Sequence, residues 1–250
     1  METKNLIYKA DYRIYPKDSD YKSHIKPSAL INYFIQSAWL HAEELGFGYS
    51  QLIKQGVGWV LSRFRIVIEK MPVWPGEMRL ETWPKGIDRI LFLRDSEIFD
   101  SNNQRLAYLT SSWLVIDVQT KRPRRTLPQA NSFIGLTSRN AIVDPAEALK
   151  FTGSPDYVER FTVKYNDIDI NMHLTTYRYI DYIFDSYNLD FLNNNVPAEM
   201  TVNFLKEIPF GSEIILHRFE NTNTHQFELI NSNNGNVCFR SRIIFKQAAR

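Results

Sequence analysis

The segment 27–45 constrains the fold of this chain more than any other. Ser28, preceded by Pro27, is expected to cap the start of a helix, and Gly46 suits its end, so we expect a helix over these residues. Apolar side chains cover most of its circumference. The narrow polar stripe that remains consists of Asn32, Gln36 and Glu43. A helix so apolar is expected to be largely surrounded by the rest of the fold.

Runs with a strand-like pattern follow this helix, separated by turn residues. They cover residues 58–68, 77–83, 91–99 and 105–117. A second helix is predicted to begin near Leu174 and to continue to Tyr187. Further strand-like runs follow it at 200–205, 213–219, 225–230 and 237–245. The same order of one helix and several strands therefore occurs twice.

Residue matches between the two halves indicate an internal duplication. Lys70 and Glu77 correspond to Lys206 and Glu213 at one common offset, and the turn 100–103 corresponds to 231–234 at a nearby one. An apolar helix with antiparallel strands is buried only if the sheet curls around it. We expect an α+β fold with an N-terminal domain at 1–125, a linker at 126–157 and a C-terminal domain at 158–250.

Composition narrows the class of protein. The 250 residues are 44% hydrophobic and carry a formal net charge of +2, which gives no support to nucleic-acid binding. A single cysteine, Cys238, excludes an internal disulfide, and its strand pattern predicts a buried structural thiol. The first residues lack the apolar core of a signal peptide, and no stretch is apolar enough to span a membrane. We expect a cytoplasmic protein.

The run 165–174 carries the strongest chemical signal. Its polar members alternate with Ile168, Ile170 and Met172, which predicts one polar face on an extended segment. These polar residues are Asp167, Asp169, Asn171 and His173. A calcium loop is excluded, because its glycine position holds Met172 and its final glutamate position holds Arg178. A hydrolytic site remains possible, and so does a simple turn with a helix cap.

Taken together, these segments resemble the acyl-ACP thioesterases over nearly the whole chain. The matching segments are 30–43, 59–64, 75–83, 94–95, 112–115, 167–173, 179–180 and 203–207. The resemblance implies two tandem hotdog domains and hydrolysis of fatty acyl-ACP, within fatty acid biosynthesis, to free fatty acid and holo-ACP. It implies acyl carrier protein as the partner and neither cofactor nor metal. The other histidines are scattered and lack zinc spacing.

The family motif Asp-x-Asn-x-His, with a later glutamate, falls on Asp169, Asn171, His173 and Glu207. The chain departs from the family pattern at two places. Leu174-Thr175-Thr176 replaces the common Val-Asn-Asn, although hydroxyls can still cap a helix. Ile208 occupies the position where plant members often have a cysteine, so a cysteine nucleophile is unavailable there.

Thioester hydrolysis requires an activated water and a donor for the oxyanion. Our hypothesis is that Asp169 and Glu207 orient and deprotonate the water, which leaves open which carboxylate is the base. Asn171 would position the water or the thioester, and His173 would bind or protonate. Apolar neighbours would raise the pKa of the base by desolvation; these are Ile168, Ile170 and Ile208. Backbone N–H groups near His173 and Leu174 are the expected oxyanion donors.

The first half shows no counterpart of the Asp-x-Asn-x-His run, and the resemblance implies that this half forms the acyl pocket. Candidate lining residues are Phe34, Trp39, Trp59 and Phe64, although such aromatics also suit a plain core. Basic residues gather at the end of this half and are candidates for docking the acidic carrier protein, or a solvated linker. They are Lys121, Arg122, Arg124 and Arg125.

Fold alone does not determine the reaction. Hotdog folds also serve enoyl-thioester hydratases and acyl-CoA thioesterases, and a non-enzymatic acyl-thioester-binding protein is a further alternative. Neither the acyl chain length nor the choice between carrier protein and coenzyme A follows from the sequence. Two fused units make a monomer sufficient, and a homodimer remains open.

Overall fold

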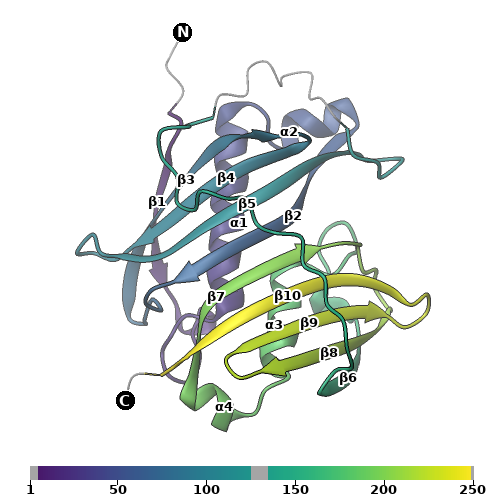
Figure 1. Ribbon diagram of the computed structural model, residues 1–250. Coiled ribbons are helices and arrows are strands. Elements are labelled where there is room, and N and C mark those ends of the chain that lie inside the picture. The colour runs from purple at the N-terminus through teal and green to yellow at the C-terminus, as the bar shows by residue number, and fades with distance from the viewer. Residues whose placement is uncertain (1–4, 125–134, 249–250) are drawn as a thin grey trace. The chain divides into compact units, whose positions relative to one another are not determined.

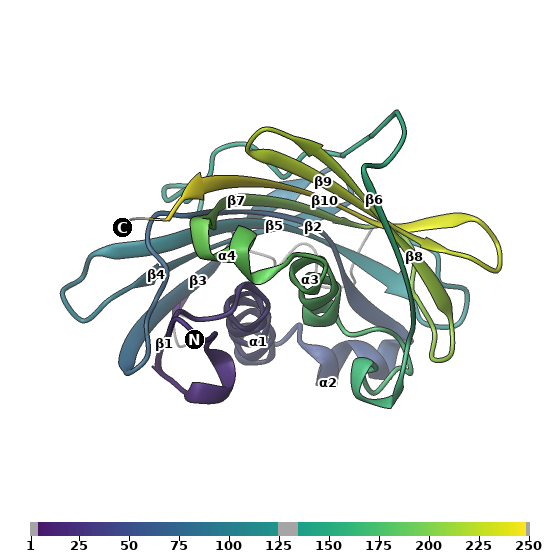
Figure 2. The same cartoon turned by 90° about the horizontal axis from the view of Figure 1, so that it is seen from below.

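The computed structural model describes residues 5–124 and 135–248. The chain divides into two compact units, Met1–Ala146 and Glu147–Arg250. In each unit an antiparallel sheet curves around one principal helix (Figures 1 and 2). Both units are therefore of the α+β class that the sequence predicts.

Unit 1 contains the long helix α1, Pro27–Leu45, and the short α2, Tyr49–Leu52, with single 3₁₀ turns at Pro16–Asp18 and Ile53–Gln55. Its strands are β1 Tyr8–Ile14, β2 Val57–Ile68, β3 Gly76–Asp88, β4 Leu91–Phe99 and β5 Arg105–Asp117. They pair in the order β1-β3-β4-β5-β2, and every pair in this order is antiparallel.

Unit 2 contains α3, Thr176–Asp185, and α4, Leu189–Asn194, with a 3₁₀ turn at Tyr165–Asp167. Its strands are β6 Tyr157–Thr162, β7 Asn195–Phe204, β8 Glu213–Asn221, β9 Thr224–Asn231 and β10 Asn236–Gln247. Their order, β6-β8-β9-β10-β7, repeats that of unit 1 strand for strand. The predicted duplication is confirmed.

The helices differ from the prediction in detail. Helix α1 has the predicted bounds, but Lys26 rather than Ser28 is its N-cap, and Gly46 ends it with a φ of 83°. It is not surrounded throughout, because Trp39 is 52% exposed. The second helix was predicted from Leu174 to Tyr187 and is shorter, beginning only at Thr176. Strands β1 and β6, which lie at the edges of the two sheets, were not predicted.

The described part of the predicted linker 126–157 divides between the units. Arg139 binds unit 1 through ion pairs with Glu81 and Glu97 on its sheet, and its carbonyl accepts a 3.0 Å hydrogen bond from the Trp83 indole. Leu149 binds unit 2, since its N–H donates to Asn203 Oδ1 at 2.7 Å. Residues 126–134 of that range lie outside the described residues.

Each principal helix is tied by a tyrosine to the 3₁₀ turn that precedes it. In unit 1 the Tyr33 hydroxyl donates to Asp18 Oδ2 at 2.9 Å, and in unit 2 the Tyr182 hydroxyl donates to Asp167 Oδ2 at 2.7 Å. Unit 2 adds Arg178, whose Nε lies 2.9 Å and Nη2 2.7 Å from Asp167 Oδ1. The carboxylate of Asp167 thus holds the start of α3 against the preceding turn.

The pKa of Asp167 lies below its ordinary value. Burial alone would raise it, but hydrogen bonds from the Lys164 N–H, Tyr182 and Arg178 outweigh burial and favour the charged form. A carboxylate whose pKa is lower in the folded state stabilises the fold above the unfolded pKa of ~3.9. This contribution disappears as the pH falls through the lower folded pKa.

We therefore expect Asp167→Asn to lower the free energy of unfolding by about 1–3 kcal/mol at pH 7, because Arg178 and Tyr182 lose a charged acceptor. The difference from wild type should shrink below about pH 4. Urea denaturation followed by circular dichroism at both pH values measures it, with the exposed Asp11→Asn as control. Equal stability at pH 7, or a difference that persists in acid, would contradict the assignment.

Candidate active site

Residues 168–174 form a tight turn rather than the predicted extended segment. The Asp169 N–H donates to the His173 carbonyl at 2.9 Å, and the Met172 N–H donates to the Asp169 carbonyl at 3.0 Å. Met172 has a φ of 63°, and an isolated bridge between Ile168 and Leu174 closes the turn. The prediction of one polar face is wrong, because Asp167 is buried in the preceding 3₁₀ turn.

Asp169 shapes this turn. Its Oδ1 accepts hydrogen bonds from the backbone N–H of Asn171 at 2.8 Å and of His173 at 3.3 Å. Its Oδ2 accepts from the Asn171 side-chain amide at 3.3 Å. Aspartate commonly stabilises turns by bonding to the backbone in this way. Both carboxylate oxygens are therefore engaged, and the amide of Asn171 is oriented by one of them.

The segment 207–210 pairs with the turn and brings Glu207 to His173. The Leu174 N–H donates to the Ile208 carbonyl at 2.7 Å, and the Phe210 N–H donates to the Met172 carbonyl at 3.1 Å. Glu207 Oε2 then lies 3.4 Å from His173 Nε2. All four predicted site residues belong to unit 2 and are linked by these contacts.

Two expectations about the surroundings of this site are wrong. Asp169 and Glu207 are exposed rather than desolvated, and Ile170 is 86% exposed because it lies at the tip of the turn, although Ile208 is buried. The N–H of His173 is bound to Asp169 and that of Leu174 to Ile208, so neither is available to an oxyanion. The side chain of Thr175, the residue before α3, forms no capping hydrogen bond.

Tyr179 of α3 is a residue to which the sequence assigned no role. It is buried, and its ring stacks on Phe239 with 5.0 Å between the centroids. Burial raises the pKa of its phenol, and electrostatic interactions with Cys238, Glu207 and Asp169 raise it further. The hydroxyl therefore stays protonated within electrostatic reach of both site carboxylates. In the sequence, the position of Tyr179 on an otherwise apolar helix face was the signal that could have indicated a role.

Unit 1 contains a turn of the same geometry, which corrects the expectation that the first half has no counterpart. The Asp20 N–H donates to the His24 carbonyl at 2.7 Å, and the Ser23 N–H donates to the Asp20 carbonyl at 3.0 Å. Asp20 Oδ1 accepts from the N–H groups of Lys22 at 2.8 Å and His24 at 2.9 Å. Ser23 has a φ of 63°, as Met172 does.

The strand-end segment beside this turn is also repeated. The Ile25 N–H donates to the Pro72 carbonyl at 2.9 Å, and the Trp74 N–H donates to the Ser23 carbonyl at 2.8 Å. Met71 therefore occupies the position that Glu207 has in unit 2. Unit 1 keeps the aspartate and the histidine of the turn but has Lys22 in place of Asn171.

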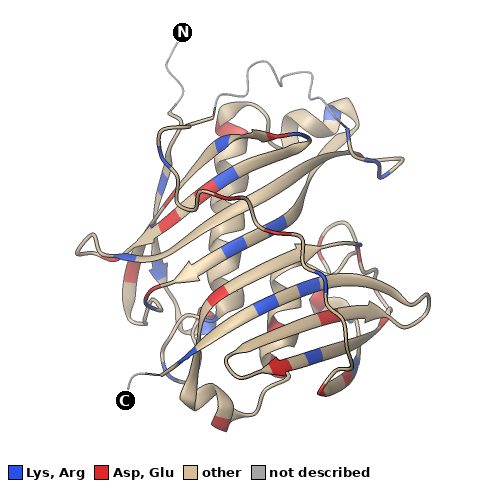
Figure 3. Ribbon diagram, in the orientation of Figure 1, with Lys and Arg blue, Asp and Glu red and all other residues tan. Residues whose placement is uncertain are grey.

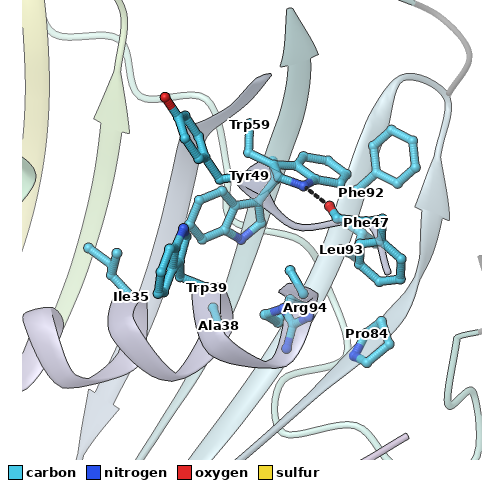
Figure 4. Close-up of a pocket in the computed structure, with 12 residues that line it drawn as sticks. Ile35, Ala38, Trp39, Phe47, Tyr49, Trp59, Pro84, Phe92, Leu93 and Arg94 are labelled. Carbon is cyan, nitrogen blue, oxygen red and sulfur yellow. Dashed lines mark hydrogen bonds between the residues drawn. The ribbon is translucent and has the colours of Figure 1, made fainter. Parts of the chain in front are cut away.

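An aromatic cavity with a volume of about 160 Å³ lies in unit 1 (Figure 4). Trp39 and Trp59, two of the predicted acyl-pocket residues, line it, and the Trp59 indole donates to the Phe47 carbonyl at 2.8 Å. Phe34 and Phe64, the other two, line a much smaller neighbouring cavity of about 10 Å³. Arg94 and Trp113 contribute to the walls of both cavities.

Lysine and arginine are interspersed with acidic residues along the strands of both units (Figure 3). Of the predicted docking residues, Lys121, Arg122 and Arg124 are exposed after β5, and Arg124 Nη2 forms a 2.7 Å ion pair with Asp117 Oδ2. Arg125 lies outside the described residues.

Cys238 is buried as predicted, and burial raises the pKa of its thiol, which disfavours a nucleophilic thiolate. In the ranges that the structure describes, no group of three His, Cys, Asp or Glu side chains is arranged to hold a metal. Helices long and apolar enough to cross a membrane are likewise absent from those ranges.

Comparison with known proteins gives matches over both units. Residues 5–133 match the acyl-ACP thioesterase N-terminal domain, and residues 154–247 match the C-terminal domain. The chain is 23% identical over 217 residues to a chloroplastic palmitoyl-acyl carrier protein thioesterase of Gossypium hirsutum, covering 81% of this chain and 52% of that protein. It spans about half the length of the curated relatives it matches.

Two solved structures superpose on nearly all of this chain. An acyl-ACP thioesterase from Bacteroides thetaiotaomicron superposes with a TM-score of 0.88 at 26% identity, covering 98% of this chain and 100% of that one. A 12:0-ACP thioesterase from Umbellularia californica gives 0.86 at 18% identity, with 98% of each chain covered. The fold is thus the tandem hotdog, and the chain belongs to the acyl-ACP thioesterase family.

Proposed function

We propose that this protein is a hydrolase in fatty acid biosynthesis that cleaves fatty acyl-ACP to free fatty acid and holo-ACP in the cytoplasm. Family membership supports the reaction class. The observation that carries the proposal is the 3.4 Å approach of Glu207 to His173 beside the oriented amide of Asn171. The carboxylate can act as a base and the imidazole as a proton carrier. The amide can donate a hydrogen bond to the carbonyl oxygen of the substrate.

Comparison with the turn in unit 1 distinguishes the residues that shape the turn from the residues proposed to react. Asp20 makes the same backbone hydrogen bonds as Asp169, yet its turn has Met71 where the second carboxylate would be. We therefore assign Asp169 as a positioning residue and Glu207 as the general base. This assignment also agrees with the three donors that already occupy the oxygens of Asp169.

In the proposed reaction Glu207 removes a proton from a water whose oxygen attacks the thioester carbonyl carbon. The side-chain amide of Asn171 has a second N–H, and this donates to the developing oxyanion. The C–S bond then breaks with both electrons going to sulfur, and His173 passes the proton from Glu207 to that thiolate. Thiolates leave readily, so the last step needs little assistance.

Three substitutions distinguish the roles of the carboxylates. Glu207→Gln removes the base and should lower kcat by about 10²–10⁴-fold. Asp169→Asn keeps an oxygen acceptor for the backbone N–H groups of Asn171 and His173, so we expect kcat within about tenfold of wild type. The pH–rate profile of Asp169→Asn should keep the acid limb of the wild type. Asp169→Ala should lose the hydrogen bonds from the N–H groups of Asn171 and His173, and with them most of the activity.

Steady-state kinetics on one acyl-ACP measures these variants, with Asp20→Asn in unit 1 as the matched control. A loss in Asp169→Asn as large as that in Glu207→Gln would show that Asp169 is the base.

The reaction itself is tested by thiol release from acyl-ACP thioesters of graded chain length, each matched to its coenzyme A thioester. We expect release from the carrier thioesters, with a preference for carrier over coenzyme A and for one range of chain length. We assign the acyl chain to the aromatic cavity, with Trp39 and Trp59 in contact and Phe34 and Phe64 beyond. Binding without release would favour an acyl-binding protein, and a hydroxyacyl product from enoyl thioesters would favour a hydratase.

Carrier docking is assigned to Lys121 and Arg122, which are exposed basic residues in the segment that follows β5. Replacing both with glutamate should raise KM for acyl-ACP by about tenfold, since like charges oppose the approach of an acidic partner. KM for the matched acyl-CoA should not change, which makes it the internal control. An unchanged KM for acyl-ACP would remove this surface from consideration.

A further inference from the structure

Arg94 of β4 is a buried cation in the wall of the aromatic cavity of unit 1 (Figure 4). Arg94 is only 7% exposed. Nη1 contacts Thr82 Oγ1 at 3.2 Å and His41 Nδ1 at 3.0 Å. Nε and Nη2 form no hydrogen bond with any residue that the structure describes, and no aspartate or glutamate of those ranges forms an ion pair with Arg94.

The neighbouring histidine does not neutralise this charge. Burial and the charge of Arg94 lower the pKa of His41 to about 4, so the imidazole is neutral at physiological pH. Its Nε2 lies 3.1 Å from the Asn5 carbonyl oxygen, which leaves Nδ1 to accept from Arg94. Burial lowers the pKa of Arg94 to about 9, and the guanidinium therefore remains protonated. Among the described residues, no counter-ion balances the positive charge in the wall of this cavity.

The remaining wall determines what kind of ligand suits this charge. Besides Arg94 the lining is aliphatic and aromatic, including Trp39, Trp59, Phe92 and Trp113. A buried cation without a counter-ion is unfavourable, and a carboxylate can bond to two guanidinium N–H groups at once. An unbranched alkyl chain suits the apolar surface.

We infer that this cavity binds a fatty carboxylate, with the carboxylate paired to the free edge of the Arg94 guanidinium. The inference rests on the proposed function in that a fatty carboxylate is the product of acyl-ACP hydrolysis. The acyl group of a thioester substrate has no charge to offer Arg94, whereas the released acid has one. The free product therefore competes for the cavity. The carboxylate that pairs with Arg94 could also come from a substrate whose acyl chain ends in a second carboxyl group.

Binding is measured through tryptophan fluorescence, because Trp39, Trp59 and Trp113 line the cavity. Dodecanoate and the uncharged dodecanol are titrated separately at pH 7.5, below their micelle-forming concentrations. We expect dodecanoate to bind the wild type roughly tenfold more tightly or better, since hydrogen bonds between charged groups exceed neutral ones. Arg94→Met should abolish this difference, Arg94→Lys should keep part of it, and the exposed Arg13→Met should keep all of it.

Equal affinity of the wild type for the acid and the alcohol would overturn the inference, and this comparison needs no variant to fold. A preference that persists in Arg94→Met would also overturn it. Competitive inhibition of thioester hydrolysis by dodecanoate identifies the product as the source. Preferential hydrolysis of the thioester of dodecanedioic acid identifies the terminal carboxyl group instead. Dodecanoate binding by a protein that hydrolyses no thioester would refute the proposed function alone.

Discussion

One carboxylate accepting backbone N–H groups determines the geometry of the candidate site. Asp169 bonds to the N–H of residues two and four positions later, and this closes a turn in which Met172 takes a left-handed conformation. The turn then exposes an edge that pairs with the segment 207–210. Without that pairing nothing would bring Glu207 to His173. The chemistry therefore depends on a local Asx hydrogen-bond pattern more than on the sheet that supports it.

The duplication shows which features of this turn belong to the fold. Unit 1 repeats the Asx bonds at Asp20, the left-handed residue and the tyrosine tie to the preceding 3₁₀ turn. These features therefore belong to the shape of the unit, since they persist where Lys22 and Met71 replace the amide and the carboxylate. Arg94 is a feature of unit 1 of a different kind, because this buried cation lines the cavity and has no role in the turn. Unit 2 carries the candidate reacting groups, and unit 1 carries an apolar cavity.

Much of this architecture followed from periodicity, and the failures have physical causes. Strands β4 and β5 have the predicted bounds because turn residues delimit them, among them Ser101, Asn102 and Asn103. Strands β1 and β6 each pair with one neighbour and carry many polar residues, so they lack a clear pattern. Alternation in 167–173 suggested an extended face, but two side-chain-to-backbone bonds curled it into a turn. The first copy of that turn went unnoticed because the side-chain pattern is incomplete: Asp20 and His24 recur, but Lys22 stands in place of the asparagine.

The candidate site is exposed, so water has to be excluded from it before Glu207 can act as an efficient base. Glu207 is exposed, and a carboxylate in water is a weak base, so efficient proton removal requires that water be excluded when substrate binds. The turn carries apolar side chains where it meets solvent, with Ile170 86%, Met172 57% and Phe210 53% exposed. Exposed apolar side chains that surround polar groups are typical of surfaces that become covered on binding. Under the proposed function, the substrate itself therefore completes the active site, since its apolar parts exclude water from around Glu207.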